Sequence, residues 1–365
     1  MNNRIVMLNN IPSPYCVDLF RALQKNLPEY EFHFIFTSIG EGNRSWKADT
    51  EGLNHAEVLK SRVLRLKTRY DERYIHFPGS IGTLLDAIDP AIVAAKEYNP
   101  SALQSLAWCR RHHRRYVHIT EGTLHSERNL NPIQLLSRKL IISSADFCLA
   151  ASTRAKEKLL YWKCPEEKIK IAYLTFDLSK MKHIPEDPVP GRILYVGSMA
   201  ERKGLDLLIR SLRHLPASWS LHIAGTGSEE ELIALKALAG QCGIHDRIQF
   251  SGYLEGEKLE REYAEASLFV LPTREDCFGL VLLEAAVKGI PIVASKYADG
   301  AYDVVEPGIT GLLEDPYEAK RFAGAMKQVL EDSQFAANAK AQDLSRFSLE
   351  EVCGVYKEVF RALTL

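Results

Sequence analysis

The sequence predicts an α/β protein made of two doubly wound parallel-sheet domains in tandem. The chain has 365 residues, more than a single hydrophobic core usually supports. A strand–turn–helix pattern begins at residue 4 and again at residue 192, so both halves open in the same way. Residues 179–191 contain three prolines and mixed charge, which indicates a linker between the halves. We therefore expect domains at 1–178 and 192–348, followed by a helix over 349–365.

The second half shows the clearest alternation of short apolar runs with helix-favouring runs. Strands are expected at 192–196, 220–224, 247–250, 268–271 and 290–294. Helices are expected after the opening turn through 212 and at 229–239, 258–264, 279–288 and 319–330. Strands that alternate with helices of this length imply a parallel sheet.

The first half is less regular, although its opening follows the same order. Strands are expected at 4–8, 32–36, 91–95, 116–120 and 147–151. Apolar residues at three- and four-residue spacing predict the first helix over 17–27.

Composition indicates an ordinary globular protein, with 46% hydrophobic and 25% charged residues. Its seven cysteines are scattered and include no Cys-x-x-Cys pair, which argues for a reducing compartment and against a disulfide framework or a zinc site. No run approaches 18 apolar residues, and no signal-peptide core follows the N-terminus. We expect a cytoplasmic protein without a membrane span.

The segment from Pro272 to Ala286 carries the strongest chemical signal. An apolar run ends at Pro272, a polar loop follows, and a helix-favouring run then holds Glu284 among aliphatic residues. Asp276 lies eight residues before Glu284, or Glu275 takes its place if the register of the loop differs by one. Two carboxylates and a helix N-terminus thus meet at the carboxyl end of a strand, where open α/β sheets bind ligands.

This layout resembles the acidic donor-sugar motif of glycosyltransferase family 4, the glycosyl transferases group 1, which are retaining enzymes of the GT-B fold. Other segments resemble the family in the same order, from Ala145 to Asp177 and at Tyr195–Gly204, Ile223–Gly227, Phe250–Tyr253 and Glu306–Pro316. The resemblance implies two Rossmann-like domains facing a central cleft. The first would lie on the acceptor side, with helix 349–365 packed back on it, and the second would bind a nucleotide-sugar.

The resemblance also implies a metal-independent transfer of a sugar from a nucleotide-sugar, UDP-linked before GDP-linked, to a glycan or lipid-linked acceptor. Polysaccharide, lipopolysaccharide or glycolipid biosynthesis would be the setting. The chain has no Asp-x-Asp motif of the kind that holds a metal in other sugar transferases, so no cofactor is expected. Lys203, with Arg202 beside it, would then neutralise the leaving diphosphate. Ser198 stands where the family has an arginine.

By the same resemblance, Glu284 would bind the ribose hydroxyls. Asp276 would bind hydroxyls of the transferred sugar, although an Asp that caps its own loop is the alternative. The remaining donor-side residues expected from the motif are Gly225, Tyr253, Cys277, Phe278, Gly279 and Leu280.

On the acceptor side, the strand 116–120 ends in a polar turn. Glu121 takes the place of the family's histidine, His125 follows four residues later, and His118 lies inside the strand. Glu121 and His125 both stay candidates for the position beside the sugar, and His118 equally fits a core residue. The residues Pro12, Ser13, Pro14 and Tyr15 form either one edge of the acceptor site or a plain turn before a helix.

Basic residues concentrate in the first half, where residues 1–190 hold 27 Lys and Arg against 21 Asp and Glu. The stretches 60–69 and 110–115 would contact an anionic membrane surface or form a solvated face. Nucleic-acid binding is not expected at a net charge of −1. Two rival functions stay open: a nucleotide-sugar 2-epimerase of the same architecture, and a non-catalytic nucleotide-sugar-binding protein.

Overall fold

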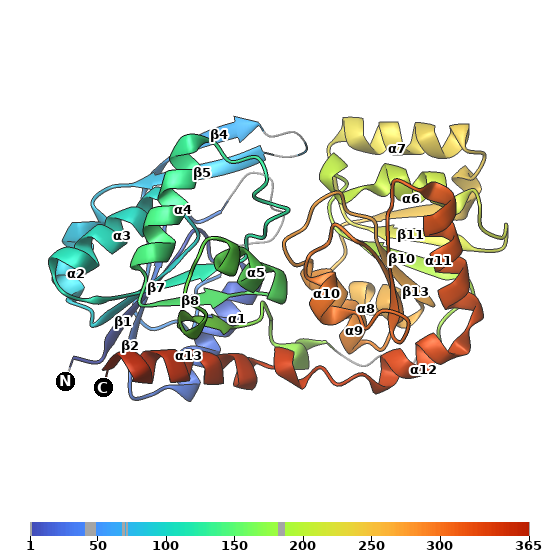
Figure 1. Cartoon of the computed structure of the whole chain (residues 1–365). Coiled ribbons are helices and arrows are strands. Elements are labelled where there is room, and N and C mark those ends of the chain that lie inside the picture. The colour runs from blue at the N-terminus through green and yellow to red at the C-terminus, as the bar shows by residue number, and fades with distance from the viewer. Residues whose placement is uncertain (1, 41–48, 68–69, 71, 182–186, 365) are drawn as a thin grey trace. The chain divides into compact units, whose positions relative to one another are not determined.

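The computed structural model describes residues 2–40, 49–67, 70, 72–181 and 187–364, and the chain divides into two units (Figure 1). Unit 1 comprises Met1–Asp177 and Ser345–Leu365, and unit 2 comprises Leu178–Leu344. Part of the expected linker belongs to unit 2, where the backbone N–H of Val189 donates to the carbonyl of Glu265 at 2.9 Å. Residues 182–186 of that linker lie outside the described residues.

Unit 1 is built on a seven-stranded parallel sheet in the order β3-β2-β1-β6-β7-β8-β9. Its strands are β1 (Arg4–Asn9), β2 (Glu31–Phe36), β3 (Ala56–Val58), β6 (Ile92–Lys96), β7 (Arg115–Thr120), β8 (Phe147–Ala150) and β9 (Ile169–Ile171). The hairpin of β4 (Ser61–Lys67) and β5 (Glu72–Pro78) forms a separate antiparallel ribbon.

Helices cover both faces of this sheet, because successive residues of a buried strand point to opposite sides. Ile5 and Met7 of β1 belong to the core under α1 (Pro14–Asn26) and α13 (Leu349–Thr364). Val6 and Leu8 belong to the opposite core. The helices of that second face are α2 (Ile81–Ile88), α3 (Pro100–Arg111), α4 (Pro132–Ser144) and α5 (Thr153–Tyr161).

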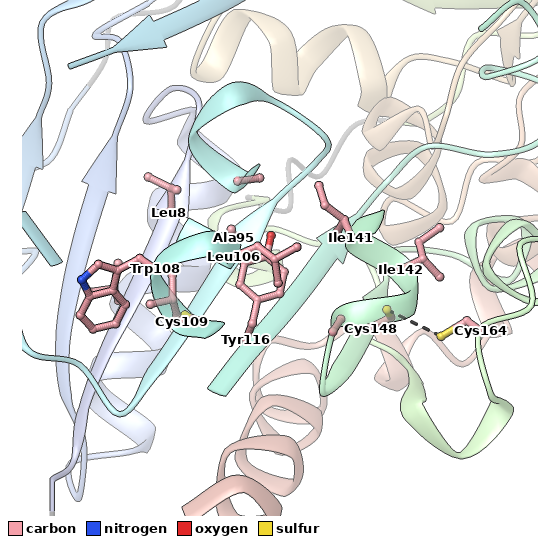
Figure 2. Packing of buried hydrophobic residues seen from close by; sticks show 14 of the residues in the cluster. Leu8, Ala95, Leu106, Trp108, Cys109, Tyr116, Ile141, Ile142, Cys148 and Cys164 are labelled. Carbon is pink, nitrogen blue, oxygen red and sulfur yellow. Dashed lines mark hydrogen bonds between the residues drawn. The ribbon is translucent and has the colours of Figure 1, made fainter. Parts of the chain in front are cut away.

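Figure 2 shows part of this second core, with Ile141 and Ile142 of α4 close to Tyr116 and Cys148. Trp108 and Cys109 extend the core along α3. This face therefore anchors α4 through one side of the helix.

Unit 2 contains a six-stranded parallel sheet in the order β12-β11-β10-β13-β14-β15. Its strands are β10 (Arg192–Val196), β11 (Ser220–Ala224), β12 (Ile248–Gly252), β13 (Leu268–Leu271), β14 (Ile292–Ser295) and β15 (Gly311–Glu314). The strand order reverses between β10 and β13, which defines a topological switch point, and ligands bind at the carboxyl ends of strands there.

The helices of unit 2 follow its strands in a βα alternation. They are α6 (Leu205–Leu212), α7 (Glu229–Gln241), α8 (Glu257–Ala264), α9 (Leu280–Val287), α10 (Ala301–Val304), α11 (Ala319–Glu331) and α12 (Ser333–Ala341). None of the helices in the described part of the chain is both long and apolar enough to span a bilayer.

The structure places the start of the first helix differently from the sequence expectation, and it adds a strand in the charged stretch 60–69. The first helix begins at Pro14 and not at residue 17, because proline fits the first helical turn, where its missing N–H costs no hydrogen bond. The charged stretch 60–69 forms strand β4 over Ser61–Lys67, whereas residues 68–69 lie outside the described residues. Alternating charged and aliphatic side chains there match the two-residue period of a strand.

Candidate donor site in unit 2

Two glycines allow the loops at the switch point of unit 2 to approach each other closely. Gly204, with φ 73°, ends the turn that follows β10, and a Cβ atom there would lie 2.1 Å from the carbonyl oxygen of Pro272 after β13. Gly225 follows β11, and a Cβ atom there would lie 1.7 Å from the carbonyl oxygen of Gly197. Only glycine permits these approaches, so the loops after β10, β11 and β13 form one compact edge.

Lys203 and Asp276 form an ion pair at this edge, with 2.6 Å between Lys203 Nζ and Asp276 Oδ2. Their side chains are 16% and 13% exposed. Arg202 Nη1 lies 3.9 Å from the same carboxylate and donates to the carbonyl of Glu275 at 2.8 Å. Burial favours a raised pKa for Asp276, but the charges of Lys203 and Arg202 outweigh it and hold the pKa below its ordinary value.

The carboxylate of Asp276 also organises its own loop, since Oδ1 accepts from the backbone N–H of Phe278 at 3.3 Å. Its backbone is fixed by hydrogen bonds with Tyr297 and Asp299. The structure thus places Asp276 both as a loop cap and as the partner of Lys203. Cys277 beside it has a partly exposed side chain.

Helix α9 begins directly after this loop. Gly279 precedes it in the left-handed conformation, with φ 76°, and Leu280 is its first residue. The first backbone N–H groups of a helix have no partner within the helix, so this end of α9 suits a negatively charged group.

Glu284 lies within α9 and accepts a hydrogen bond from the hydroxyl of Tyr263 at 2.6 Å. Burial is the main cause of its raised pKa, which this hydrogen bond partly offsets. Tyr263 comes from α8 and is fully enclosed, so it fixes the position of the carboxylate. The sequence expectation did not include Tyr263, because its partner lies 21 residues away on another helix.

Arg274 is a second residue that the sequence expectation missed. Its guanidinium bonds both carboxylate oxygens of Asp206, at 2.8 and 2.7 Å, and the carbonyl of Glu201 at 2.6 Å. The loop after β13 is thereby tied to the turn that carries Lys203. Two other donor-side candidates lie near the end of β12. The backbone N–H of Gly225 donates to the carbonyl of Gly252, and Tyr253, which follows Gly252 in the chain, is exposed.

The turn after β10 holds Ser198 at the position where the resemblance predicts an arginine. The carbonyl of Ser198 accepts from the hydroxyl of Tyr195 at 2.6 Å. Within the described residues, no three His, Cys, Asp or Glu side chains are grouped so that they could hold a metal ion.

In unit 1, the carboxyl ends of β6 and β7 bring a different pair together. Lys96 ends β6 and forms an ion pair with Glu121, which directly follows β7. The backbone N–H of Glu121 donates to Glu97 Oε1 at 2.6 Å. Lys96 also lies over the ring of Tyr15, with its Nζ 5.2 Å from the ring centre. Glu121 is therefore fixed by neighbours that the sequence did not reveal.

The two histidine candidates lie in different environments. His118 is fully buried against Tyr98, with 4.5 Å between ring centres, and neither ring nitrogen has a hydrogen-bond partner among the described residues. Burial, followed by the nearby charges of Lys158 and Arg138, holds its pKa well below the ordinary value. His118 is thus a neutral residue enclosed in unit 1, whereas His125 lies half-buried in the loop after β7.

The turn before α1 holds the remaining acceptor-side candidates. Pro12 and Ser13 are buried, Pro14 is exposed at the start of the helix, and Ser13 caps it without a side-chain hydrogen bond. Tyr15 is the member of this group that reaches the Lys96–Glu121 pair.

The two α/β units and the compact edge at the switch point define a protein of the GT-B class. Residues 179–345 match the family model described as Glycosyl transferases group 1. This part of the chain, which includes the compact edge, is therefore similar to the glycosyltransferase domains of that family.

Similar proteins agree with this class. The D-inositol 3-phosphate glycosyltransferase of Xylanimonas cellulosilytica is 32% identical over 178 residues, 47% of this chain and 42% of that protein. The lipopolysaccharide 1,6-galactosyltransferase of Salmonella typhimurium is 27% identical over 194 residues, 52% of this chain and 54% of that protein. The chain thus spans about half the length of these two relatives or less.

A solved structure of HepE from Anabaena in complex with UDP shares the fold, with a TM-score of 0.79 and 18% identity over 98% of this chain and 100% of that one. This likeness extends over both units and confirms the predicted fold class.

Proposed function

We propose that the whole chain is a retaining glycosyltransferase of family 4 that transfers a sugar from a nucleotide-sugar, UDP-linked in the first place and GDP-linked next, without a metal ion. The acceptor would be a glycan or a lipid-linked sugar in polysaccharide, lipopolysaccharide or glycolipid biosynthesis. The relative from Salmonella typhimurium, named as a lipopolysaccharide galactosyltransferase, and the UDP complex of HepE support this choice of acceptor and nucleotide.

One observation carries the proposal: Lys203 pairs with Asp276 in the loop after β13, and Glu284 lies in α9, the helix that directly follows this loop, where Tyr263 holds it. A nucleotide-sugar needs a cation for its diphosphate and an acceptor of hydrogen bonds for its ribose hydroxyls. Lys203 and Arg202 supply positive charge, and the carboxylate of Glu284 supplies the acceptor. Metal independence is proposed because these side chains can neutralise the leaving group themselves.

Binding of the donor would begin with an exchange of partners. The diphosphate replaces Asp276 at the ammonium group of Lys203, while the first N–H groups of α9 donate to its oxygens. The carboxylate of Asp276 is then released to accept hydrogen bonds from the transferred sugar. As the glycosidic bond breaks, negative charge grows on the diphosphate, and Lys203 stabilises that charge in place.

Unit 1 would supply the acceptor side. Glu121, held by Lys96, is the carboxylate proposed to accept a hydrogen bond from an acceptor hydroxyl, and His125 is the alternative. Front-face attack, the course generally ascribed to this family, requires no separate carboxylate nucleophile.

The proposal is tested by measuring the release of free nucleotide from UDP-glucose, UDP-galactose and GDP-mannose in the absence of acceptor. Slow release of UDP or GDP that depends on Lys203 supports a transferase. Tight binding in calorimetry without turnover, with any acceptor tried, would show a nucleotide-sugar-binding protein instead. Conversion of the donor to its 2-epimer would show an epimerase.

A further inference from the structure

Lys158 of α5 is a lysine whose side chain is completely buried in unit 1. Burial of an ammonium group is unfavourable unless hydrogen bonds and opposite charges compensate it. Its Nζ donates to the hydroxyl of Thr120 at 2.8 Å and lies 3.5 Å from Glu127 Oε1. Thr120 ends β7, and Glu127 lies in the loop that follows this strand. One buried ammonium group therefore connects the two ends of the loop 121–126.

This loop carries both the glutamate and the histidine candidate of the acceptor side, and it passes directly over the buried ion pair. Gly122 leaves no room for a side chain, because a Cβ atom there would lie 2.5 Å from Glu127 Oε1 and 3.0 Å from Lys158 Nζ. Glu127 is itself held in place, since the guanidinium of Arg138 bonds both of its carboxylate oxygens at 3.3 Å. The course of the loop is thus set by a charged cluster beneath it.

A chain of hydrogen bonds also leads from the same ammonium group to Glu121. The Thr120 hydroxyl, which accepts from Lys158, donates to Glu97 Oε2 at 3.3 Å. The other carboxylate oxygen, Glu97 Oε1, accepts from the backbone N–H of Glu121 at 2.6 Å. Burial raises the pKa of Glu97, and the nearby charge of Lys158 is the main influence that lowers it. Lys158 thereby favours the ionised form of Glu97, the form that accepts both hydrogen bonds.

Glu97 has an uncommon backbone conformation for a residue with a side chain. Its φ of 61° lies in the left-handed region, and its N–H donates to the carbonyl of Ile119 in β7 at 2.8 Å. Such a conformation persists only where the surroundings fix it, and it occurs most often at functional sites. The conformation directs the carboxylate of Glu97 to the end of β7, where the loop begins.

The charges of this cluster balance within unit 1. Its three cations are Lys96, Arg138 and Lys158, and its three carboxylates are Glu97, Glu121 and Glu127. Removal of one member of a buried charged cluster leaves another charge without compensation, which is strongly unfavourable. The cluster therefore favours one fixed arrangement of the loop above it.

We propose that Lys158 and Glu97 are positioning residues that hold the carboxylate of Glu121 in place for the acceptor hydroxyl. Both act through the loop: Lys158 is buried, and the carboxylate of Glu97 is bound to the amide of Glu121. Misplacement of a reacting group by about 1 Å can slow a reaction about 100-fold, so rigid support of Glu121 matters for the rate. This inference rests on the proposed function, in which Glu121 contacts the acceptor.

The experiment breaks the hydrogen-bond chain at Thr120, where no charge is lost. Thr120→Val has nearly the same shape, but it can neither accept from Lys158 nor donate to Glu97. The kcat for release of UDP from UDP-glucose by the full chain should fall by about 10- to 100-fold. The KM for UDP-glucose and the affinity for UDP in calorimetry should stay as in the wild type, because unit 2 binds the donor. Thr120→Ser keeps the hydroxyl and should restore kcat.

A double-mutant cycle with Glu121→Gln separates positioning from a general effect on the structure. If Thr120 acts through Glu121, the double variant should be no slower than Glu121→Gln alone, because the supported carboxylate is already absent. A general loss of structure would add to the loss caused by Glu121→Gln. Glu97→Gln keeps the size of the side chain without its charge, and it provides the same cycle if Thr120→Val does not fold.

Three results would overturn the proposal: additive losses in the cycle, a kcat of Thr120→Val equal to that of the wild type, or a Glu121→Gln protein as active as the wild type. In each case the wild type still releases UDP, so the proposed transferase activity would stand. Absence of UDP release from the wild type would refute the proposed UDP-sugar transferase, and this inference with it.

Discussion

Replacement of Lys203 by methionine tests the charge arrangement of the donor site most directly. Methionine retains most of the aliphatic stem but lacks the ammonium group that lies 2.6 Å from Asp276 Oδ2. We expect turnover to fall by about 100- to 1000-fold, because loss of one preorganised group that stabilises transition-state charge costs about 2.7–4 kcal/mol. Since the diphosphate is already charged when it binds Lys203 and gains further charge as the bond breaks, kcat should fall and kcat/KM should fall at least as far.

The same variant should also be less stable, because Asp276 loses the ammonium group of Lys203. Of the two cations beside Asp276, Arg202 then remains, with Nη1 3.9 Å from the carboxylate. Leaving a partly buried carboxylate without its close partner lowers the free energy of unfolding by about 1–3 kcal/mol. In the wild type the pKa of Asp276 is lowered, which contributes stability at neutral pH that is lost as the pH falls through the folded-state value. The difference in unfolding free energy between the two proteins should therefore shrink below about pH 4.

The assay is release of free UDP from UDP-glucose without acceptor, read together with urea unfolding at neutral and acidic pH. Lys320→Met, which removes an exposed lysine from the same unit, is the control and should change neither quantity. Turnover of Lys203→Met within about twofold of the wild type, a difference of less than about 0.5 kcal/mol in the barrier, would refute the role of Lys203 in the reaction. A loss of stability alone would leave Lys203 as a purely structural partner of Asp276.

Three further predictions concern the same site. Glu284→Gln should weaken UDP binding in calorimetry by about tenfold or more, because hydrogen bonds to a charged carboxylate are worth about 1.5–3 kcal/mol, and an unchanged affinity would rule out the ribose contact. Treatment with EDTA should leave nucleotide release intact; activity that is lost and then restored by Mg²⁺ or Mn²⁺ would contradict metal independence. Saturating UDP should slow the alkylation of Cys277 by iodoacetamide but not that of Cys242, measured by peptide mass spectrometry, and equal rates at Cys277 with and without UDP would place the nucleotide elsewhere.

The sequence predicted unit 2 well because its strands are short, buried and separated by regular helices. The expected strands 220–224 and 268–271 coincide with β11 and β13, and the expected helix 319–330 falls one residue short of α11. Unit 1 was predicted less completely. Its β4–β5 hairpin and helices α2 to α5 were not expected, since charged residues and mixed patterns hide the periodicity there.

The site depends on pairs that sequence spacing does not reveal. Lys203 and Asp276 are 73 residues apart, and Tyr263 reaches Glu284 from a different helix. In unit 1, Glu121 after β7 forms an ion pair with Lys96, which ends the neighbouring strand β6. A sequence motif can identify one residue of each pair. Its partner depends on the order of the strands and the packing of the helices, which the motif does not contain.

Because α13 packs on unit 1, the position of this helix at the end of the chain affects co-translational folding. Val352, Tyr356 and Phe360 complete the same core as Phe20 and Phe34, yet they are translated after all of unit 2. Unit 2 is continuous in sequence and can close as soon as it emerges. Helix α1 covers only part of this face of the sheet in unit 1, so a ribosome that stalls before residue 349 would leave apolar core residues exposed, and chaperones bind such surfaces.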